Sequence, residues 1–162
     1  MILLDVNVLV YACRQDAIRH DEYHGWLTDA LSTGDPVGIA PESLGAVVRI
    51  TTHQRIWTNP LSIAEALAFT TTIRDAPSVV PVLPGEGHWP LFTNLCREAK
   101  ARGNLATDAW LAALAIQHGC TLMTTDRDFS RFRGLRWQHP LGINQLSDAG
   151  VRAAPALPSA AP

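Results

Sequence analysis

Acidic side chains recur where apolar segments of this sequence end. Asp5 directly follows a first apolar run, and Glu42 follows a second. Asp126 and Asp128 follow a later run, and Asp108 lies in the helical segment that leads to it. In an open parallel sheet a site forms outside the carboxyl ends of the strands. We therefore expect these carboxylates to converge on one pocket, with Glu42 at its rim.

Crowded carboxylates predict a metal site. Like charges raise one another's pKa unless a positive group lies among them. A hard divalent cation such as Mg²⁺ prefers a few carboxylates plus water, which leaves positions for phosphate oxygens and for activating water against a phosphodiester. Asp5, Asp108 and Asp126 are the expected ligands, and Mn²⁺ is expected to substitute for Mg²⁺.

Each acid also has a structural explanation. Asp5, Glu42 and Asp108 lie where a helix cap or the helix macrodipole favours an acid, and Asp126 suits a turn. Asp5 and Asp126, however, both leave apolar segments, in LLDVNVLVYA and LMTTDRDF, where an isolated charge is costly. That matched setting favours a shared function.

Other kinds of chemistry lack their motifs. The sequence has no GxSxG, Walker A or GxGxxG pattern, which argues against serine hydrolases and nucleotide-binding folds. The six histidines are scattered along the sequence, and a surface or core role is expected for each. Three cysteines without a CxxC pair favour neither a disulfide framework nor a structural zinc site.

A group of arginines follows the last acidic segment. The guanidinium groups of Arg127, Arg131, Arg133 and Arg136 lie within ten residues. They could track an RNA backbone, with Arg127, Arg131 and Arg133 as candidate contacts. Alternatively, they cover apolar surface or pair with acids such as Asp128. The formal net charge of −2 argues against a protein that holds nucleic acid by bulk positive charge.

The elements that must position these residues alternate between strands and helices. Strands are expected at residues 2–4, 37–40, 79–83, 121–124 and near 135–137. Helices are expected after residue 5 and at about 21–32, 41–50, 62–74 and 91–101, with one more capped by Thr107 and ending at Gly119. Gly85–Pro90 is expected to be a loop. This order predicts an α/β fold with a parallel sheet of four to five strands between two layers of helices.

Composition predicts a single domain. Residues 1–148 are expected to fold, and residues 149–162 to form a disordered tail rich in Ala and Pro. No run approaches the roughly 18 apolar residues of a membrane span, and the first residues do not resemble a signal peptide. A cytoplasmic location is the expectation.

Several segments together resemble the PIN domain, and specifically the VapC toxins of type II toxin–antitoxin systems. They are LLDVNVLVYA, PESLGAVVRI, LATDAWLAALAIQHG, TTDRDFSRF and LRWQHPL, and the resemblance spans roughly residues 1–142. It implies an α/β/α fold and Mg²⁺-dependent endoribonuclease activity, a hydrolase reaction. Asp5, Glu42, Asp108 and Asp126 match the family's catalytic acids. Asn7 and Thr125 match polar positions that steady them, and Asp128 is a nearby further acid.

The resemblance also implies partners. These are an RNA substrate, a VapB-type antitoxin and a second copy of the chain in a homodimer. The segments 42–57 and 62–74 are the expected antitoxin groove, with Trp57 and Phe69 as anchors. Two alternatives remain: a phosphatase resembling haloacid dehalogenases, which would need a second Asp at the position of Asn7 and a well-placed Lys, and an inert binding module of the same fold.

Overall fold

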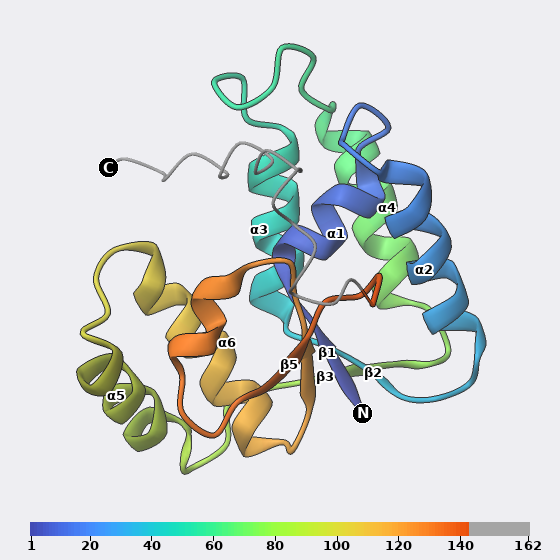
Figure 1. Ribbon diagram of the computed structural model, residues 1–162. Helices are drawn as coiled ribbons and strands as arrows, with labels where there is room; N and C mark the ends of the chain where they lie inside the picture. Colours follow the sequence, from blue (N-terminus) through green and yellow to red (C-terminus); the bar gives the residue numbers. More distant parts are fainter. Residues whose placement is uncertain (143–162) are drawn as a thin grey trace.

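A fully parallel sheet of five short strands forms the centre of the molecule. The computed structural model describes residues 1–142. The strands are β1 (Ile2–Leu4), β2 (Val37–Ile39), β3 (Val79–Pro81), β4 (Thr121–Met123) and β5 (Arg136–Gln138). Their order across the sheet is β3-β2-β1-β4-β5, with every neighbouring pair parallel. Figure 1 shows the strands at the centre, among the helices. The predicted parallel sheet of four to five strands is confirmed.

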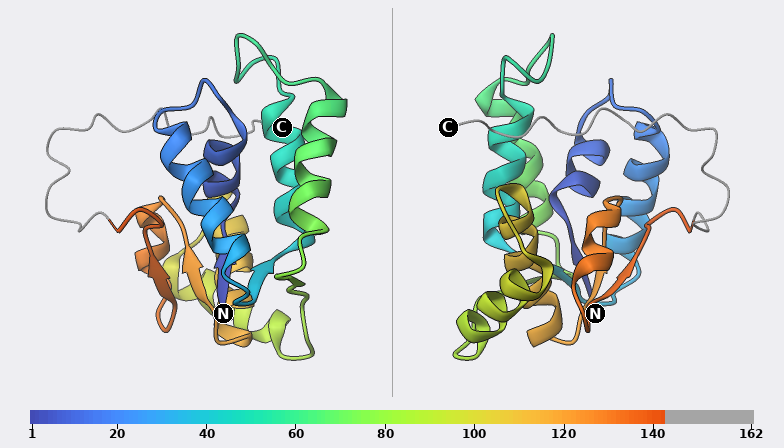
Figure 2. Two further views of the ribbon diagram at one scale, coloured as in Figure 1. Left: turned by 90° about the vertical axis from the view of Figure 1, so that its right-hand side faces the viewer. Right: turned by 60° about the vertical axis from the view of Figure 1, so that its left-hand side comes forward.

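Helices cover both faces of this sheet. The helices α1 (Val6–Cys13), α2 (His20–Ser32), α3 (Pro41–Thr51) and α4 (Ile63–Arg74) pack together on one side. On the other side α5 (His88–Ala99) packs against α6 (Asn104–Gln117), and the single turn η1 (Arg127–Arg131) contacts α6. The two turned views show these layers (Figure 2).

Each side of the sheet has its own apolar core. Leu4, Val8 and Val47 belong to the core under α1–α4, whereas Leu3 and Leu114 belong to the core under α5 and α6. Successive side chains of a strand point to opposite faces, so the neighbours Leu3 and Leu4 enter different cores. Burial on both faces explains why β1 reads as a continuous apolar run.

Local sequence signals set several helix starts. Ser62 and Glu65 form a reciprocal capping box at the start of α4, as predicted. Pro41 occupies the first turn of α3, where its missing N–H costs nothing.

Two helix starts differ from the prediction. Helix α6 begins at Asn104, so Thr107 is not its cap and Asp108 lies in its second turn. Gly103, with φ 55° and ψ −128°, reverses the chain immediately before that helix. Helix α5 begins at His88, inside the predicted loop, because the buried His88 ring packs against Trp110 of α6.

Two predictions concern residues that the structure does not describe. The domain boundary at residue 148 and the tail 149–162 lie beyond the described residues. Within residues 1–142, no helix combines the length and apolar character needed to cross a membrane.

Candidate active site

Asp5 is fixed at the carboxyl end of the central strand β1. Only 6% of it is exposed. Its Oδ1 accepts the Val6 N–H at 2.7 Å, which makes Asp5 the N-cap of α1, and its Oδ2 accepts the Thr124 hydroxyl at 2.6 Å. The strand thus ends where the helix begins, and the side chain at that junction is held from both sides.

Thr124 links the ends of the two central strands. The register pairs Leu4 with Met123, so the next residues, Asp5 and Thr124, face each other. The Thr124 hydroxyl is fully buried and accepts the Asp126 N–H at 3.0 Å and the Asn7 amide at 3.3 Å. One hydroxyl therefore orients the segments that carry both strand-end acids.

Asp126 caps the short turn η1. Its Oδ1 accepts the Asp128 N–H at 2.8 Å. Asn7 completes the link between the two strand ends, because its Oδ1 accepts the Thr125 N–H at 3.4 Å. Thr125 thus contributes its backbone amide at this point, while the neighbouring Thr124 contributes the hydroxyl.

The acids act on one another electrostatically. Burial raises the pKa of Asp5 to about 6, and the charge of Asp126 adds to that rise. Burial also raises the pKa of Asp108 to about 7, with further contributions from the charges of Asp5, Asp126 and Asp128. We call these four residues the acid cluster. The charges of Asp5, Asp126 and Asp128 thus disfavour ionisation of a neighbouring carboxyl group, as expected for carboxylates that share a site.

The acid cluster has little compensating charge. Among residues 1–142, no lysine or arginine forms a recorded ion pair with Asp5, Asp108 or Asp126, and Arg131 lies 3.7 Å from Asp128. No three His, Cys, Asp or Glu side chains of that part form a ready-made set of metal ligands. The donors are nevertheless hard oxygens with uncompensated charge, and this donor chemistry fits a divalent cation such as Mg²⁺.

Glu42 lies apart from this mutual interaction. It is exposed in the first turn of α3. The Glu42 carboxylate is not among the charges that raise the pKa of Asp5 or of Asp108. Its charge instead acts on His88, whose pKa is lowered by burial and partly restored by Glu42. The structure thus brings together Asp5, Asp108, Asp126 and Asp128, with Glu42 nearer the start of α5.

The sequence analysis missed two neighbours of the acids, Thr124 and Tyr11. Thr124 is one of two adjacent threonines, and only the pairing of β1 with β4 distinguishes them. Tyr11 lies four residues beyond Asn7, on the same face of α1, and burial together with the charges of Asp126 and Asp5 raises the pKa of its hydroxyl. The helical spacing could have suggested Tyr11, whereas Thr124 required the sheet register.

The arginines do not form one continuous edge. Arg131 lies beside Asp128 on η1. Arg136, on β5, donates to the Gly119 carbonyl at the start of β4, which is the opposite end of the sheet from the acids. Arg127 and Arg133 are exposed. Only part of the arginine group therefore borders the acid cluster.

Comparisons with known proteins cover almost all of this fold. The family model for the PIN domain matches residues 2–135. VapC ribonuclease Mb2897 of Mycobacterium bovis is 40% identical over 141 residues, which are 87% of this chain and 96% of that protein. Ribonuclease VapC25 of Mycobacterium tuberculosis is 38% identical over 140 residues, which are 86% of this chain and 99% of VapC25.

Solved structures agree at the level of the fold. A VapBC2 complex of Rickettsia felis, bound to a promoter DNA fragment, matches this chain with a TM-score of 0.63 at 18% identity. The match covers 86% of this chain and 98% of the matched chain of that complex. The FitAcB structure of Neisseria gonorrhoeae has a TM-score of 0.60 at 19% identity, with coverages of 86% and 98%. The family match includes every member of the acid cluster.

Proposed function

Since this chain belongs to the PIN-domain family and, within it, to the VapC ribonucleases, we propose that it is a toxin that cleaves RNA with the acid cluster. The observation that supports these residues is that burial and neighbouring carboxylates raise the pKa of Asp5 and of Asp108, with no cation paired to Asp5, Asp108 or Asp126 in the described part. Asp5, Asp108 and Asp126 are the proposed metal ligands.

The metal is divalent, and we propose Mg²⁺ with Mn²⁺ as a substitute, because the donors are carboxylate oxygens. A bound divalent cation supplies the positive charge that a phosphodiester needs during attack by water. The chain itself supplies orientation. Thr124 and the Val6 N–H fix both oxygens of Asp5, and the Asp128 N–H fixes one oxygen of Asp126.

The other polar residues have supporting roles in this proposal. Asn7 ties the start of α1 to Thr124 and Thr125, which keeps the two strand ends in register. Glu42 is proposed as a further catalytic acid that approaches from α3, and Asp128 adds negative charge beside Asp108. Arg127, Arg131 and Arg133 are proposed RNA contacts.

The two alternatives are weaker. A phosphatase resembling haloacid dehalogenases needs a second carboxylate at position 7, where the Asn7 amide instead donates to Thr124. An inert binding module would gain nothing from buried carboxylates that raise one another's pKa, because such charges oppose folding.

The proposed regulator is a VapB-type antitoxin, and its proposed docking region is α3 and α4. Ile63 and Leu67, one turn apart on α4, are 58% and 49% exposed, which offers an apolar stripe to a partner helix. Trp57 already donates its indole N–H to the Ile50 carbonyl, and the Arg14 guanidinium lies 4.2 Å from its ring. The homodimer and a cytoplasmic site of action remain predictions.

The experiment is cleavage of labelled single-stranded RNA by the purified chain. Activity should need a divalent cation, disappear in EDTA and return with Mg²⁺ or Mn²⁺. Asp29→Asn, an exposed change on α2, is the matched control for Asp5→Asn. Cleavage by Asp5→Asn at the rate of Asp29→Asn would contradict the proposal and indicate a contaminating nuclease.

A further inference from the structure

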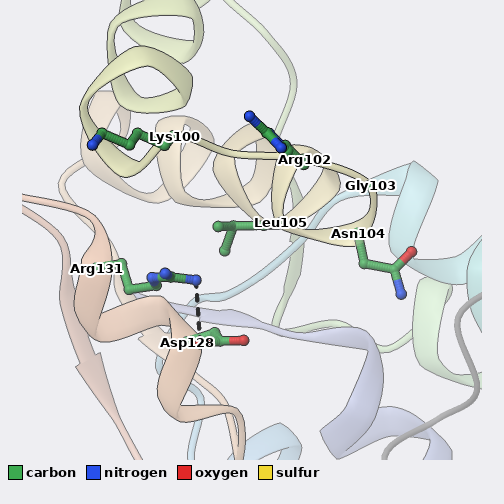
Figure 3. Close-up of a pocket in the computed structure, with 7 residues that line it drawn as sticks. All are labelled: Lys100, Arg102, Gly103, Asn104, Leu105, Asp128 and Arg131. Atoms are coloured by element: carbon green, nitrogen blue, oxygen red, sulfur yellow. Dashed lines mark ion pairs between the residues drawn. The ribbon is translucent and has the colours of Figure 1, made fainter.

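A basic region of the surface lies beside the acid cluster. An open, shallow hollow of about 510 Å³ lies between the connection from α5 to α6 and the turn η1. Lys100 and Arg102 line it from the connection, and Arg131 lines it from η1 (Figure 3). These three cations come from segments about thirty positions apart in the sequence. We call this region the basic hollow.

Positive charge in the basic hollow is largely unpaired. Its one carboxylate, Asp128, lies 3.7 Å from Arg131, and both side chains are more than half exposed. Such exposed pairs contribute little to folding stability. Lys100 and Arg102 have no side-chain hydrogen bond or ion pair recorded with any described residue. None of the three cations is therefore needed to hold the fold together.

The backbone presents these cations at a sharp turn. Lys100 has φ 51° and ψ 44°, a left-handed conformation that glycine or asparagine usually occupies. Gly103 also has a positive φ, so the chain reverses within four residues between the two helices. Lys100 is the only lysine of the chain, and it stands where its conformation is unfavourable. Local folding preference therefore does not explain a lysine here.

The basic hollow and the acid cluster share a wall. Asn104 lines the hollow, and Asp108 lies one helical turn later on the same face of α6. Asp128 also lines the hollow, and its charge raises the pKa of Asp108. A polyanion cut at the acids would therefore pass directly into a region of opposite charge.

We propose that the basic hollow binds backbone phosphates of the RNA next to the one that is cut, through Lys100, Arg102 and Arg131. This inference rests on the proposed ribonuclease function. The acid cluster repels a polyanion, so binding requires positive charge close by. Leu105 is the only large apolar residue of the lining, and a protein partner would need buried apolar anchors. An RNA strand fits the chemistry better than a peptide does.

The test measures RNA binding without cleavage. Asp5→Asn serves as the background, in EDTA, with a fluorescent single-stranded oligoribonucleotide and a series of salt concentrations. Lys100→Asn with Arg102→Gln removes two cations, and asparagine tolerates the backbone at position 100. We expect roughly tenfold weaker binding at 0.1 M salt and a plot of log affinity against log salt that is flatter by about 1.4.

Two comparison variants sharpen this test. Arg49→Gln with Arg74→Gln removes the same charge from exposed positions on α3 and α4, and should leave the slope unchanged. Asp128→Asn removes the one carboxylate of the hollow and should strengthen binding. Melting temperatures of all variants establish that each is folded.

Two results would overturn the proposal. These are an unchanged salt slope in the Lys100 and Arg102 variant, or an equal loss of RNA affinity in the α3 and α4 control. Because binding is measured apart from cleavage, a wild-type chain that never cuts RNA would defeat the proposed function without altering the result for the hollow.

Discussion

The acid cluster and the basic hollow lie side by side but hold their charges in opposite ways. Asp5 is buried and receives hydrogen bonds on both oxygens, and its pKa is raised to about 6. Lys100 and Arg102 are exposed and have no recorded side-chain partner in the described chain. Buried charges oppose folding and are fixed in place, whereas exposed charges cost little and attract ligands over a longer range.

This contrast separates the residues expected to act in catalysis from those expected to bind RNA. Changes at Asp5 and Asp108 should alter catalysis and stability, because those two carboxylates are desolvated. Changes in the basic hollow should alter RNA affinity and its dependence on salt, with little effect on stability. The comparison would fail if a substitution of Lys100 or Arg102 lowered the catalytic rate or the stability as strongly as a substitution of Asp5 does.

The largest expected effect is on catalysis. Asp5→Asn, Asp108→Asn or Asp126→Asn should each lower the rate at saturating RNA by at least about 100-fold, the scale of removing one electrostatic stabiliser of a transition state. Single-turnover cleavage assays measure this rate. The comparison would break if loss of Lys100 and Arg102 reduced that rate as strongly.

The second effect is on stability and its dependence on pH. The raised pKa values mean that, between about pH 4 and pH 7, the folded chain binds more protons at Asp5 and Asp108 than the unfolded chain does. The free energy of unfolding should therefore fall as pH rises through this range in the absence of metal. Asp5→Asn should raise the free energy of unfolding by about 2 kcal/mol at pH 7.5. Removing the buried charge gains about 3 kcal/mol, because the pKa of Asp5 is raised by about 2 units, and losing part of the hydrogen bonding offsets some of that gain.

Urea unfolding at pH 4 and pH 7.5 tests this prediction. Asp29→Asn is the matched control and should show no gain at either pH. A gain for Asp5→Asn that is equal at both values of pH would show that its ionisation is not the cause.

Divalent cations should offset this instability. A cation at ten times its dissociation constant adds about 1.4 kcal/mol to the free energy of unfolding. Mn²⁺ at pH 7.5 should accordingly raise the Tm of the wild type and have little effect on Asp5→Asn or Asp108→Asn. An equal rise in all three proteins would place the bound metal elsewhere.

The next effect distinguishes two neighbouring threonines. Thr124→Val leaves the buried Asp5 carboxylate and the Asp126 N–H without the hydroxyl that serves both, and should cost about 1–2 kcal/mol and roughly tenfold in cleavage. Thr124→Ser keeps the hydroxyl and should retain most activity. Thr125→Val should lose less stability and less activity, because Thr125 donates to Asn7 through its backbone N–H, which the substitution keeps. Equal losses at positions 124 and 125 would contradict the assignment.

The smallest expected effect belongs to the hollow. Arg131→Gln should change the free energy of unfolding by less than about 0.5 kcal/mol, because its exposed pair with Asp128 is weak. It should flatten the salt slope of RNA binding by about 0.7. A clear drop in Tm with an unchanged slope would show that Arg131 supports the fold instead.

Local rules predicted much of the fold. Apolar runs identified the first four strands, β1 to β4, and Ser62 with Glu65 identified the start of α4. Asp5 and Asp126 were selected because each follows a buried strand. These signals depend on residues within a few positions of one another, and such interactions can be read along the chain.

Tertiary structure decided the contacts between distant segments. Thr124 bonds Asp5 across 119 positions only because β1 pairs with β4 in that register. Arg131 joins Lys100 and Arg102 only because η1 lies against the start of α6. Sequence by itself therefore determined which residues end strands and carry charge. The pairing of strands and the packing of helices decided which of those charges meet, because that choice depends on burying two apolar cores at once.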